Sequence, residues 1–382
     1  MPWKETTLVL ERKTFIRVWE SGLFTFRDLC GHFAVSRRIG YKWISRYKAE
    51  GMEGLVDRSR APHGCPHKTP DEVEAAIVAM KKKWPRWGPK KIIDELRKSE
   101  RDKEWPAIST AGEVLKRHGL VKKRRRRSKW KHPVTPPILA TRPNELWTID
   151  FKGEFRLGDA SVCYPLTIQD RWSRYVLCCD GMARPQLLAV MNSMERLFRE
   201  VGLPERIRSD NGQPFASHGL AGLTRLNVWW MLLDIVHERI GKGRPDQNGA
   251  HERMHRELKA ETTLPPAENM RGQQNLFQGF RDDYNYHRPH EAIGQRRPSE
   301  LWQPTHRPYP NRIGDPEYPG HFEVRKVRSG GDIKLKGQVQ FVSHALAGHR
   351  IGLEPVDDGI WSVIFANTLL GRYDERMKRI FG

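Results

Sequence analysis

The sequence has 382 residues, and its 67 Lys and Arg exceed its 46 Asp and Glu to give a formal charge of +21. This length allows roughly two to four domains, and the charge indicates a polyanionic partner, although a ribosome-associated protein would show the same balance. No apolar run reaches about 18 residues and no signal-peptide core follows Met1. We therefore expect no membrane span, and a cytoplasmic, nucleoid-associated protein.

Two stretches near the N-terminus have the pattern of a helix-turn-helix. Residues 25–33 predict a short helix, Ala34-Val35 a turn, and Ser36 the N-cap of a helix over 37–50 that ends at Gly51. An ordinary helical hairpin with a solvated basic face would give the same pattern. In the DNA-binding interpretation, the side chains that reach DNA are Arg37, Arg38, Tyr41, Lys42 and Arg46.

A second helical module is predicted after a Pro-containing link. Residues 71–83 have helical spacing of apolar residues, another helix should start near Pro89, and a third should begin at an N-cap, Ser109, and end at Gly119. The link contains His63, Cys65 and His67, but no second ligand pair at finger-like spacing, so we do not expect a zinc site.

A basic run follows, formed by Lys122, Lys123, Arg124, Arg125, Arg126 and Arg127. Such a run is often a solvated tail without a specific partner. Here it lies between a predicted DNA reader and a predicted catalytic region, and prolines follow it. We therefore favour a linker that contacts DNA phosphates.

The central region predicts a hairpin-rich sheet with flanking helices. The strand candidates are Leu146–Phe151, Tyr164–Asp170, Arg174–Cys179 and Glu205–Ser209. Residues 185–201 predict a helix whose inward side chains are Leu187, Leu188, Met191, Met194, Leu197 and Phe198. Five cysteines (Cys30, Cys65, Cys163, Cys178, Cys179) form no spaced framework, so we expect reduced packing residues, with Cys178 and Cys179 on opposite faces of a strand.

Three acids on separate elements suggest a site for hard cations. Asp150 ends a strand, Asp210 precedes Asn-Gly after another strand, and Glu252 lies in the first turn of a helix. Each has an ordinary alternative: a buried structural aspartate, a turn former, or an acid at a helix N-terminus. Together they are the oxygen donors that Mg²⁺ prefers, and two such ions can promote phosphoryl transfer.

These residues also carry a resemblance. The order WTIDF, SDNG and GRPDQNGAHER, followed by Lys259, resembles the Asp-Asp-Glu core of integrase-type bacterial insertion-sequence transposases, within these the IS481-like group. The stretch from Phe33 to His63 and WGPKKIIDEL are similar to the family's two DNA-binding modules, and Tyr284–Trp302 to its closing signature. The gap between Asp210 and Glu252 is longer than in many relatives, and we place the excess in residues 217–227.

The resemblance implies an RNase H-like core in which Asp150, Asp210 and Glu252 hold two Mg²⁺ ions, for which Mn²⁺ can substitute. It also implies cleavage that frees a 3′ hydroxyl, followed by strand transfer into target DNA, and assembly of at least a dimer on double-stranded DNA. Lys259 shares the Glu252 face and is expected to hold the DNA end. The competing acids Asp170, Asp180 and Glu257 rank lower, and Glu257 is assigned to the surface.

From Phe322 onward, short alternating runs separated by Gly, Asp and Asn predict a small all-β barrel. The predicted domains are a helix-turn-helix domain (1–60), a second one (69–121), a linker (122–140), an RNase H-like core (141–303) and the barrel (320–382). We expect a DNA transposase; a DNA-binding regulator without catalysis and a simple nuclease are the alternatives.

Overall fold

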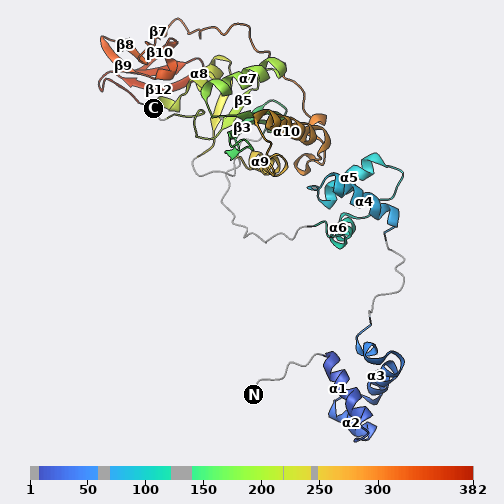
Figure 1. Cartoon of the computed structure of the whole chain (residues 1–382). Helices are drawn as coiled ribbons and strands as arrows, with labels where there is room; N and C mark the ends of the chain where they lie inside the picture. The colour runs from blue at the N-terminus through green and yellow to red at the C-terminus, as the bar shows by residue number, and fades with distance from the viewer. Residues whose placement is uncertain (1–7, 59–68, 122–139, 218, 242–247, 382) are drawn as a thin grey trace. The chain divides into compact units, whose positions relative to one another are not determined.

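The computed structural model describes residues 8–58, 69–121, 140–217, 219–241 and 248–381 (Figure 1). The basic run 122–127, the HGCPH segment and most of the Gly243–Gly249 loop lie outside these ranges. Internal contacts divide the chain into two units, residues 1–71 and 72–382. No helix of the described residues is long and apolar enough to cross a bilayer.

The first unit is a compact set of helices: α1 (Leu8–Glu20), α2 (Phe26–His32), α3 (Arg37–Glu50) and the short η1 (Gly51–Leu55). Thr25 caps α2 by accepting from Asp28 N, and Ser36 caps α3 by accepting from Ile39 N. Gly40 allows α3 to approach α2, because a Cβ there would lie 2.9 Å from Phe26 Cζ. The expected helix-turn-helix is confirmed, with the N-cap where the sequence places it.

The second unit begins with the helices α4 (Asp71–Lys83), α5 (Pro89–Ser99) and α6 (Ile108–Arg117), which enclose their own cluster around Ile77, Ile92 and Leu115. The expectation that Ser109 caps α6 is wrong. Ala107 is the N-cap and makes no side-chain cap hydrogen bond, and Ser109 lies inside the first turn. Burial of Ala111, Val114 and Leu115 holds this helix in place without a polar cap.

The central sheet contains β1 (Leu146–Phe151), β2 (Phe155–Arg156), β3 (Val162–Asp170), β4 (Val176–Met182), β5 (Arg206–Ser209) and β6 (Val236–Arg239). β3 lies between β1 and β4, which it pairs with in antiparallel register, and β1, β5 and β6 are parallel neighbours. The expected start of β4 at Arg174 is wrong, because Arg174 has φ 68° in the left-handed turn before the strand.

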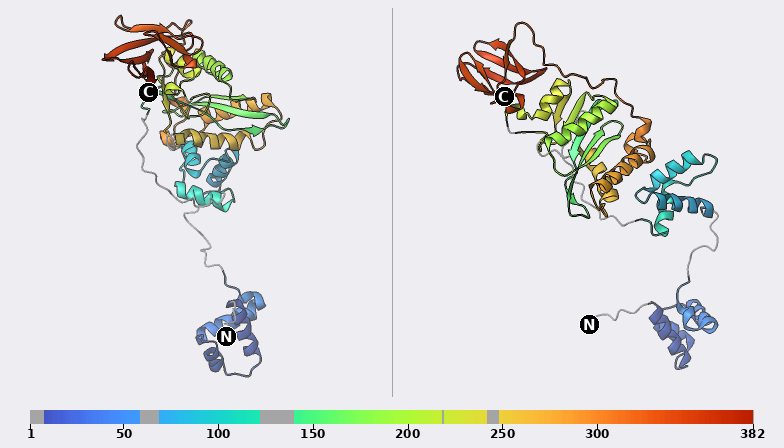
Figure 2. Two further views of the ribbon diagram at one scale, coloured as in Figure 1. Left: turned by 90° about the vertical axis from the view of Figure 1, so that its left-hand side faces the viewer. Right: turned by 45° about the horizontal axis from the view of Figure 1, so that its top comes forward.

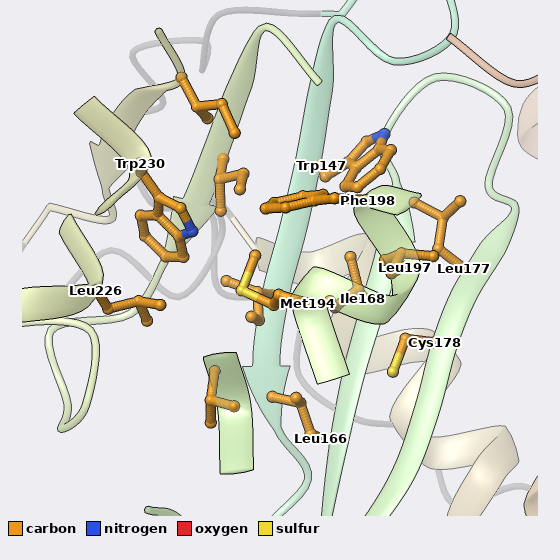
Figure 3. Packing of buried hydrophobic residues seen from close by; sticks show 14 of the residues in the cluster. Trp147, Leu166, Ile168, Leu177, Cys178, Met194, Leu197, Phe198, Leu226 and Trp230 are labelled. Carbon is orange, nitrogen blue, oxygen red and sulfur yellow. The ribbon is translucent and has the colours of Figure 1, made fainter. Parts of the chain in front are cut away.

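Helices cover both faces of this sheet (Figure 2). They are α7 (Leu187–Val201), α8 (Arg225–Leu232), α9 (Gly249–Thr262) and α10 (Met270–Asp282), with short helical turns η2 (Leu220–Gly222), η4 (Asp283–His287), η5 (Glu291–Ile293) and η6 (Pro298–Glu300). On one face, α7 and α8 pack over Trp147 and Ile149, and the rings of Trp147 and Phe198 lie 6.0 Å apart (Figure 3). On the other face, α9 and α10 pack over Cys163 and Cys179.

Cys178 belongs to the first of these clusters and Cys179 to the second, so the two face opposite sides of β4 as expected. All four described cysteines are buried and free. The expected inward position of Leu188 is wrong, since its side chain is 70% exposed and Val190 is buried instead.

The edge of the sheet at β4 is covered by side chains from α10 and η4. Asn285 accepts from Val176 N (2.8 Å) and donates to Val176 O (2.9 Å). Gln274 likewise accepts from Gly181 N and donates to Cys179 O, both at 2.9 Å. These amides occupy the places of a further strand, so the closing signature around Asn285 locks the helices onto the sheet.

The C-terminal region is all β. It contains β7 (Glu323–Lys326), β8 (Asp332–Leu335), β9 (Gln338–Phe341), β10 (Arg350–Asp357), β11 (Ile360–Phe365), β12 (Thr368–Asp374) and β13 (Arg379–Phe381), with the turn η7 (His344–Leu346). The strands β13-β12-β11-β10-β7 form one antiparallel sheet, and the β8–β9 hairpin contacts both its ends. Their common core also includes Leu223 and Val228 of the central region.

Candidate metal-dependent nucleic-acid site

The alternation of β1 places Asp150 on the α9 face of the sheet. Trp147 and Ile149 point into the α7 cluster, so Thr148 and Asp150 point to the opposite face. The Asp150 side chain is 18% exposed, and Asn248 Nδ2 donates to its Oδ2 at 3.0 Å. His255 Nδ1 lies 4.0 Å from the same oxygen.

The parallel pairing of β1 with β5 brings Asp210 to the same edge. Both strands end there, and Asp210 follows Ser209, the last residue of β5. Gly212 N donates to Asp210 Oδ1 at 3.0 Å, and Asn211 Nδ2 donates to Ile240 O at 2.7 Å. The Asp-Asn-Gly turn therefore holds the carboxylate at the strand end, as a turn former would also do.

Helix α9 brings the third acid. Glu252 lies in its first turn and is exposed, and Lys259 is exposed two turns later, as expected for one face. The two flanking arginines, Arg253 and Arg256, are exposed as well.

The three acids are close enough to affect one another. Burial, the largest cause, and the negative charges of Asp210 and Glu252 together raise the pKa of Asp150 from 3.8 to about 7, against the opposing backbone hydrogen bond of Phe151 and the charge of Lys152. Among the described residues, no three His, Cys, Asp or Glu side chains lie in an arrangement that would enclose one ion. The donor set nevertheless fits a hard divalent cation, because it combines carboxylate oxygens with an excess of negative charge that such an ion would compensate.

The competing acids have other partners. Asp170 is fully buried and accepts from Ser173 N (2.7 Å) and Asn144 N (2.8 Å), which fixes the β3–β4 turn. Asp180 pairs with Arg196 on α7.

The assignment of Glu257 to the surface is wrong. Its side chain is 17% exposed and pairs with Arg86 Nε at 2.6 Å and Arg288 Nη2 at 2.9 Å. Burial alone would raise the pKa of Glu257, but the hydrogen bonds and charges of these arginines lower it to about 2. Glu257 is therefore a structural ion-pair residue and a poor control for Glu252.

Sequence reasoning missed two histidines of α9. His251-Glu252-Arg253-Met254-His255 has the H-E-x-x-H spacing of zinc-binding helices, which was the available signal. Both imidazoles are buried, with 1% and 5% exposure, and hydrogen-bond to threonines of β1 and β3. Threonine hydroxyls occupy both ring nitrogens of His251 and Nε2 of His255, so the pair does not offer a zinc ion two free nitrogens.

The first unit carries the predicted DNA-contacting residues on α3. Arg37, Arg38, Tyr41 and Lys42 are exposed, and Arg46 is half-buried. The Lys42 and Arg46 cations lie 4.8 and 5.1 Å from the centre of the Trp43 ring, which restricts both side chains.

Protein-family models match the chain in consecutive parts. A helix-turn-helix domain matches residues 11–63 and a homeodomain-like domain matches residues 39–115. Two models described as integrase core domain match residues 140–245 and 233–298. The C-terminal domain of the IS481 family transposase matches residues 322–380.

Among curated proteins, an uncharacterized 39.2 kDa protein of insertion element IS476 from Xanthomonas euvesicatoria is 24% identical over 70% of this chain and 75% of its own length. An uncharacterized 31.7 kDa protein of insertion element IS407 from Burkholderia multivorans is 28% identical over 42% of this chain. The chain spans 55% of the length of this second relative.

Two solved structures are also similar. One is the simian T-cell lymphotropic virus intasome in complex with PP2A regulatory subunit B56 gamma, with 18% identity, a TM-score of 0.39, and coverage of 72% of this chain and 93% of the matched chain. The other is the HTLV-2 integrase catalytic core domain in complex with magnesium, with 14% identity, a TM-score of 0.31, and coverage of 42% and 97%. Matches to helix-turn-helix domains, to an integrase core and to the C-terminal domain of the IS481 family transposase thus follow one another along this chain, and the curated relatives are insertion-element proteins.

Proposed function

We propose that the protein is a DNA transposase that binds the terminal inverted repeats of an insertion sequence, cleaves their 3′ ends and transfers them into target DNA. The observation that carries the proposal is the parallel pairing of β1 with β5, which brings Asp150 and Asp210 to the same end of the sheet of an integrase-type core, and the charges of Asp210 and Glu252 both act on Asp150. The order of helix-turn-helix domains before this core supports a DNA substrate.

Asp150, Asp210 and Glu252 would hold two Mg²⁺ ions, or Mn²⁺ in their place. When bound, such ions make water a stronger nucleophile and stabilise the charge of the leaving oxygen. Asn248 restricts the Asp150 carboxylate through its 3.0 Å hydrogen bond. Lys259, exposed on the Glu252 side of α9, would contact a phosphate of the DNA end.

DNA recognition is assigned to the helical modules. Arg37, Arg38, Tyr41, Lys42 and Arg46 would contact the major groove or its phosphates, and the basic run 122–127 would add affinity without sequence preference. Because two element ends must meet in one reaction, at least a dimer on DNA is part of the proposal. We also propose the five domain ranges that the sequence predicts.

The test is an assay of purified full-length protein with labelled element ends, a target plasmid and Mg²⁺. Joined products that depend on Glu252 are expected. Glu200, an exposed glutamate on α7, supplies a matched control as Glu200→Gln. Specific binding without cleavage would instead support a regulator, and cleavage without joining a nuclease.

A further inference from the structure

A buried polar cluster lies between the sheet and α9. It consists of Thr148 on β1, Thr167 on β3, and His251 and His255 on α9. His251 Nδ1 lies 2.7 Å from Thr148 Oγ1, and its Nε2 lies 2.6 Å from Thr167 Oγ1. His255 Nε2 lies 2.6 Å from the same Thr167 oxygen.

Thr167 is the hub of this cluster. Its hydroxyl contacts both imidazoles and also lies 3.1 Å from the backbone oxygen of Asp150. A hydroxyl has one hydrogen and two acceptor sites, so one threonine can serve all three neighbours. The Thr167 hydroxyl thereby links the backbone of Asp150 on β1 to α9, the helix that carries Glu252.

Apolar packing alone would leave the position of α9 less defined. Its apolar contacts with the sheet come from Met254 and Leu258, both fully buried. Such contacts are non-directional, so they set the distance of the helix but constrain its rotation and axial shift only weakly. Three short hydrogen bonds to fixed strand atoms are directional, and breaking them would leave buried polar atoms unpaired.

We infer that His251 and His255, joined through Thr167, are positioning residues that fix Glu252 relative to Asp150. The inference rests on the proposed function, because it concerns the arrangement of the same acids. It also explains why an H-E-x-x-H sequence occurs here without a zinc site: the histidines face inward to the threonines, and the intervening glutamate faces outward. Each ring nitrogen of His251 faces a threonine hydroxyl, an arrangement that suits a ring with one donor and one acceptor nitrogen.

The test compares full-length variants that remove or keep the hub. Thr167→Val removes the hydroxyl at nearly constant shape, and Thr167→Ser retains it. His255→Leu removes one contact, whereas His255→Gln places an amide near the position of Nε2. The matched control is Thr262→Val, since Thr262 is also a buried threonine but its hydroxyl donates to Leu258 O within α9.

Two measurements are made on each variant. Amide hydrogen exchange of residues 249–262 without metal reports the anchoring of α9, and the Mg²⁺ or Mn²⁺ concentration for half-maximal thermal stabilisation reports the assembled acids. We expect faster exchange and a metal midpoint raised about tenfold or more for Thr167→Val and His255→Leu. Thr167→Ser, His255→Gln and Thr262→Val should remain near wild type.

Equal exchange and equal midpoints in Thr167→Val and Thr262→Val would overturn the inference. Stoichiometric zinc binding that His255→Leu abolishes would also overturn it, because the histidines would then be ligands. If wild-type protein neither responds to Mg²⁺ or Mn²⁺ nor joins ends, the proposed function fails. The metal-free exchange comparison still decides whether the hub anchors α9.

Discussion

The raised pKa of Asp150 predicts an unusual pH dependence of stability in the metal-free protein. A carboxyl with an ordinary pKa of 3.8 in the unfolded chain and about 7 in the folded core binds its proton more tightly when folded. Between these values the unfolded chain releases the proton and the core retains it, so the free energy of unfolding falls as pH rises from about 4 to 7. At ~1.4 kcal/mol per pH unit, the loss approaches about 4 kcal/mol.

Asp150→Asn isolates this effect. Asparagine keeps an acceptor oxygen for Asn248 but cannot ionise, so the variant should gain stability over wild type as pH rises. In urea denaturation with a chelator, followed by tryptophan fluorescence, the two proteins should differ little near pH 4, and Asp150→Asn should be more stable by up to about 4 kcal/mol at pH 8. Adding Mg²⁺ at pH 8 should stabilise wild type more than the variant, because the ion compensates the carboxylates.

The control for the substitution itself is Asp358→Asn, at an aspartate whose side chain is 93% exposed. If the difference between wild type and Asp150→Asn were the same at pH 5 and pH 8, Asp150 would not carry the raised pKa. That outcome would also count against the convergence of the three acids, because the charges of Asp210 and Glu252 add to the effect of burial on that pKa.

Four further changes test other parts of the molecule. Glu252→Gln should leave the melting temperature of the metal-free protein nearly unchanged and lower strand transfer by orders of magnitude; near-normal joining would contradict its role. Glu257→Gln should destabilise the protein by about 1–2 kcal/mol in urea denaturation, because it weakens a largely buried pairing with two arginines, and an unchanged midpoint would contradict this. Asn285→Leu should cost about 1–3 kcal/mol in the same assay, since both backbone groups of Val176 lose their partner. Replacing residues 122–127 with Ser should weaken binding to all DNA sequences about equally and flatten its salt dependence; an unchanged salt slope would show that the run does not contact phosphates.

Short-range features of the fold were predictable from the sequence. Ser36 caps α3 through an amide three residues away, as predicted, and β1 has the predicted bounds because its strand-forming residues are consecutive. The positions of Asp210 after a strand and of Glu252 in the first turn of a helix are also as predicted, while their role as a site stays a prediction. Each of these inferences needed only neighbouring residues and the period of the element.

The features that the sequence did not reveal depend on distant partners. Glu257 contacts Arg86, 171 positions earlier, and His251 contacts Thr148 across 103 positions. Spacing on α9 could not distinguish a solvated glutamate from an ion-paired one, nor an inward histidine from a ligand. Leu188 has the composition of a core residue, but its place on α7 leaves it 70% exposed.

The segment between Asp210 and Glu252 is longer than in many relatives, but its length alone did not indicate what the additional residues do. Residues 217–227 were identified as the excess, without a role. In the structure Leu223 is buried against the C-terminal strands, Leu220 packs beside it, and a Cβ on Gly371 would lie 3.3 Å from Leu220 Cδ1. This segment is therefore part of the surface on which the C-terminal region packs.

The geometry of α9 explains how one helix carries Glu252 of the candidate site and also the structural contacts of His255 and Glu257. Successive residues turn by about 100°, so Lys259 lies about 20° from Glu252 around the axis, while His255 lies about 60° to one side. Glu257 lies about 140° from Glu252, on the flank that Arg86 and Arg288 contact. Rotation of α9 by even one residue would turn Glu252 away from Asp150 and break the contacts of His255 and Glu257 together. The position of Glu252 is thus determined by the contacts on both flanks of α9. A search for metal ligands alone would miss the residues that make these contacts.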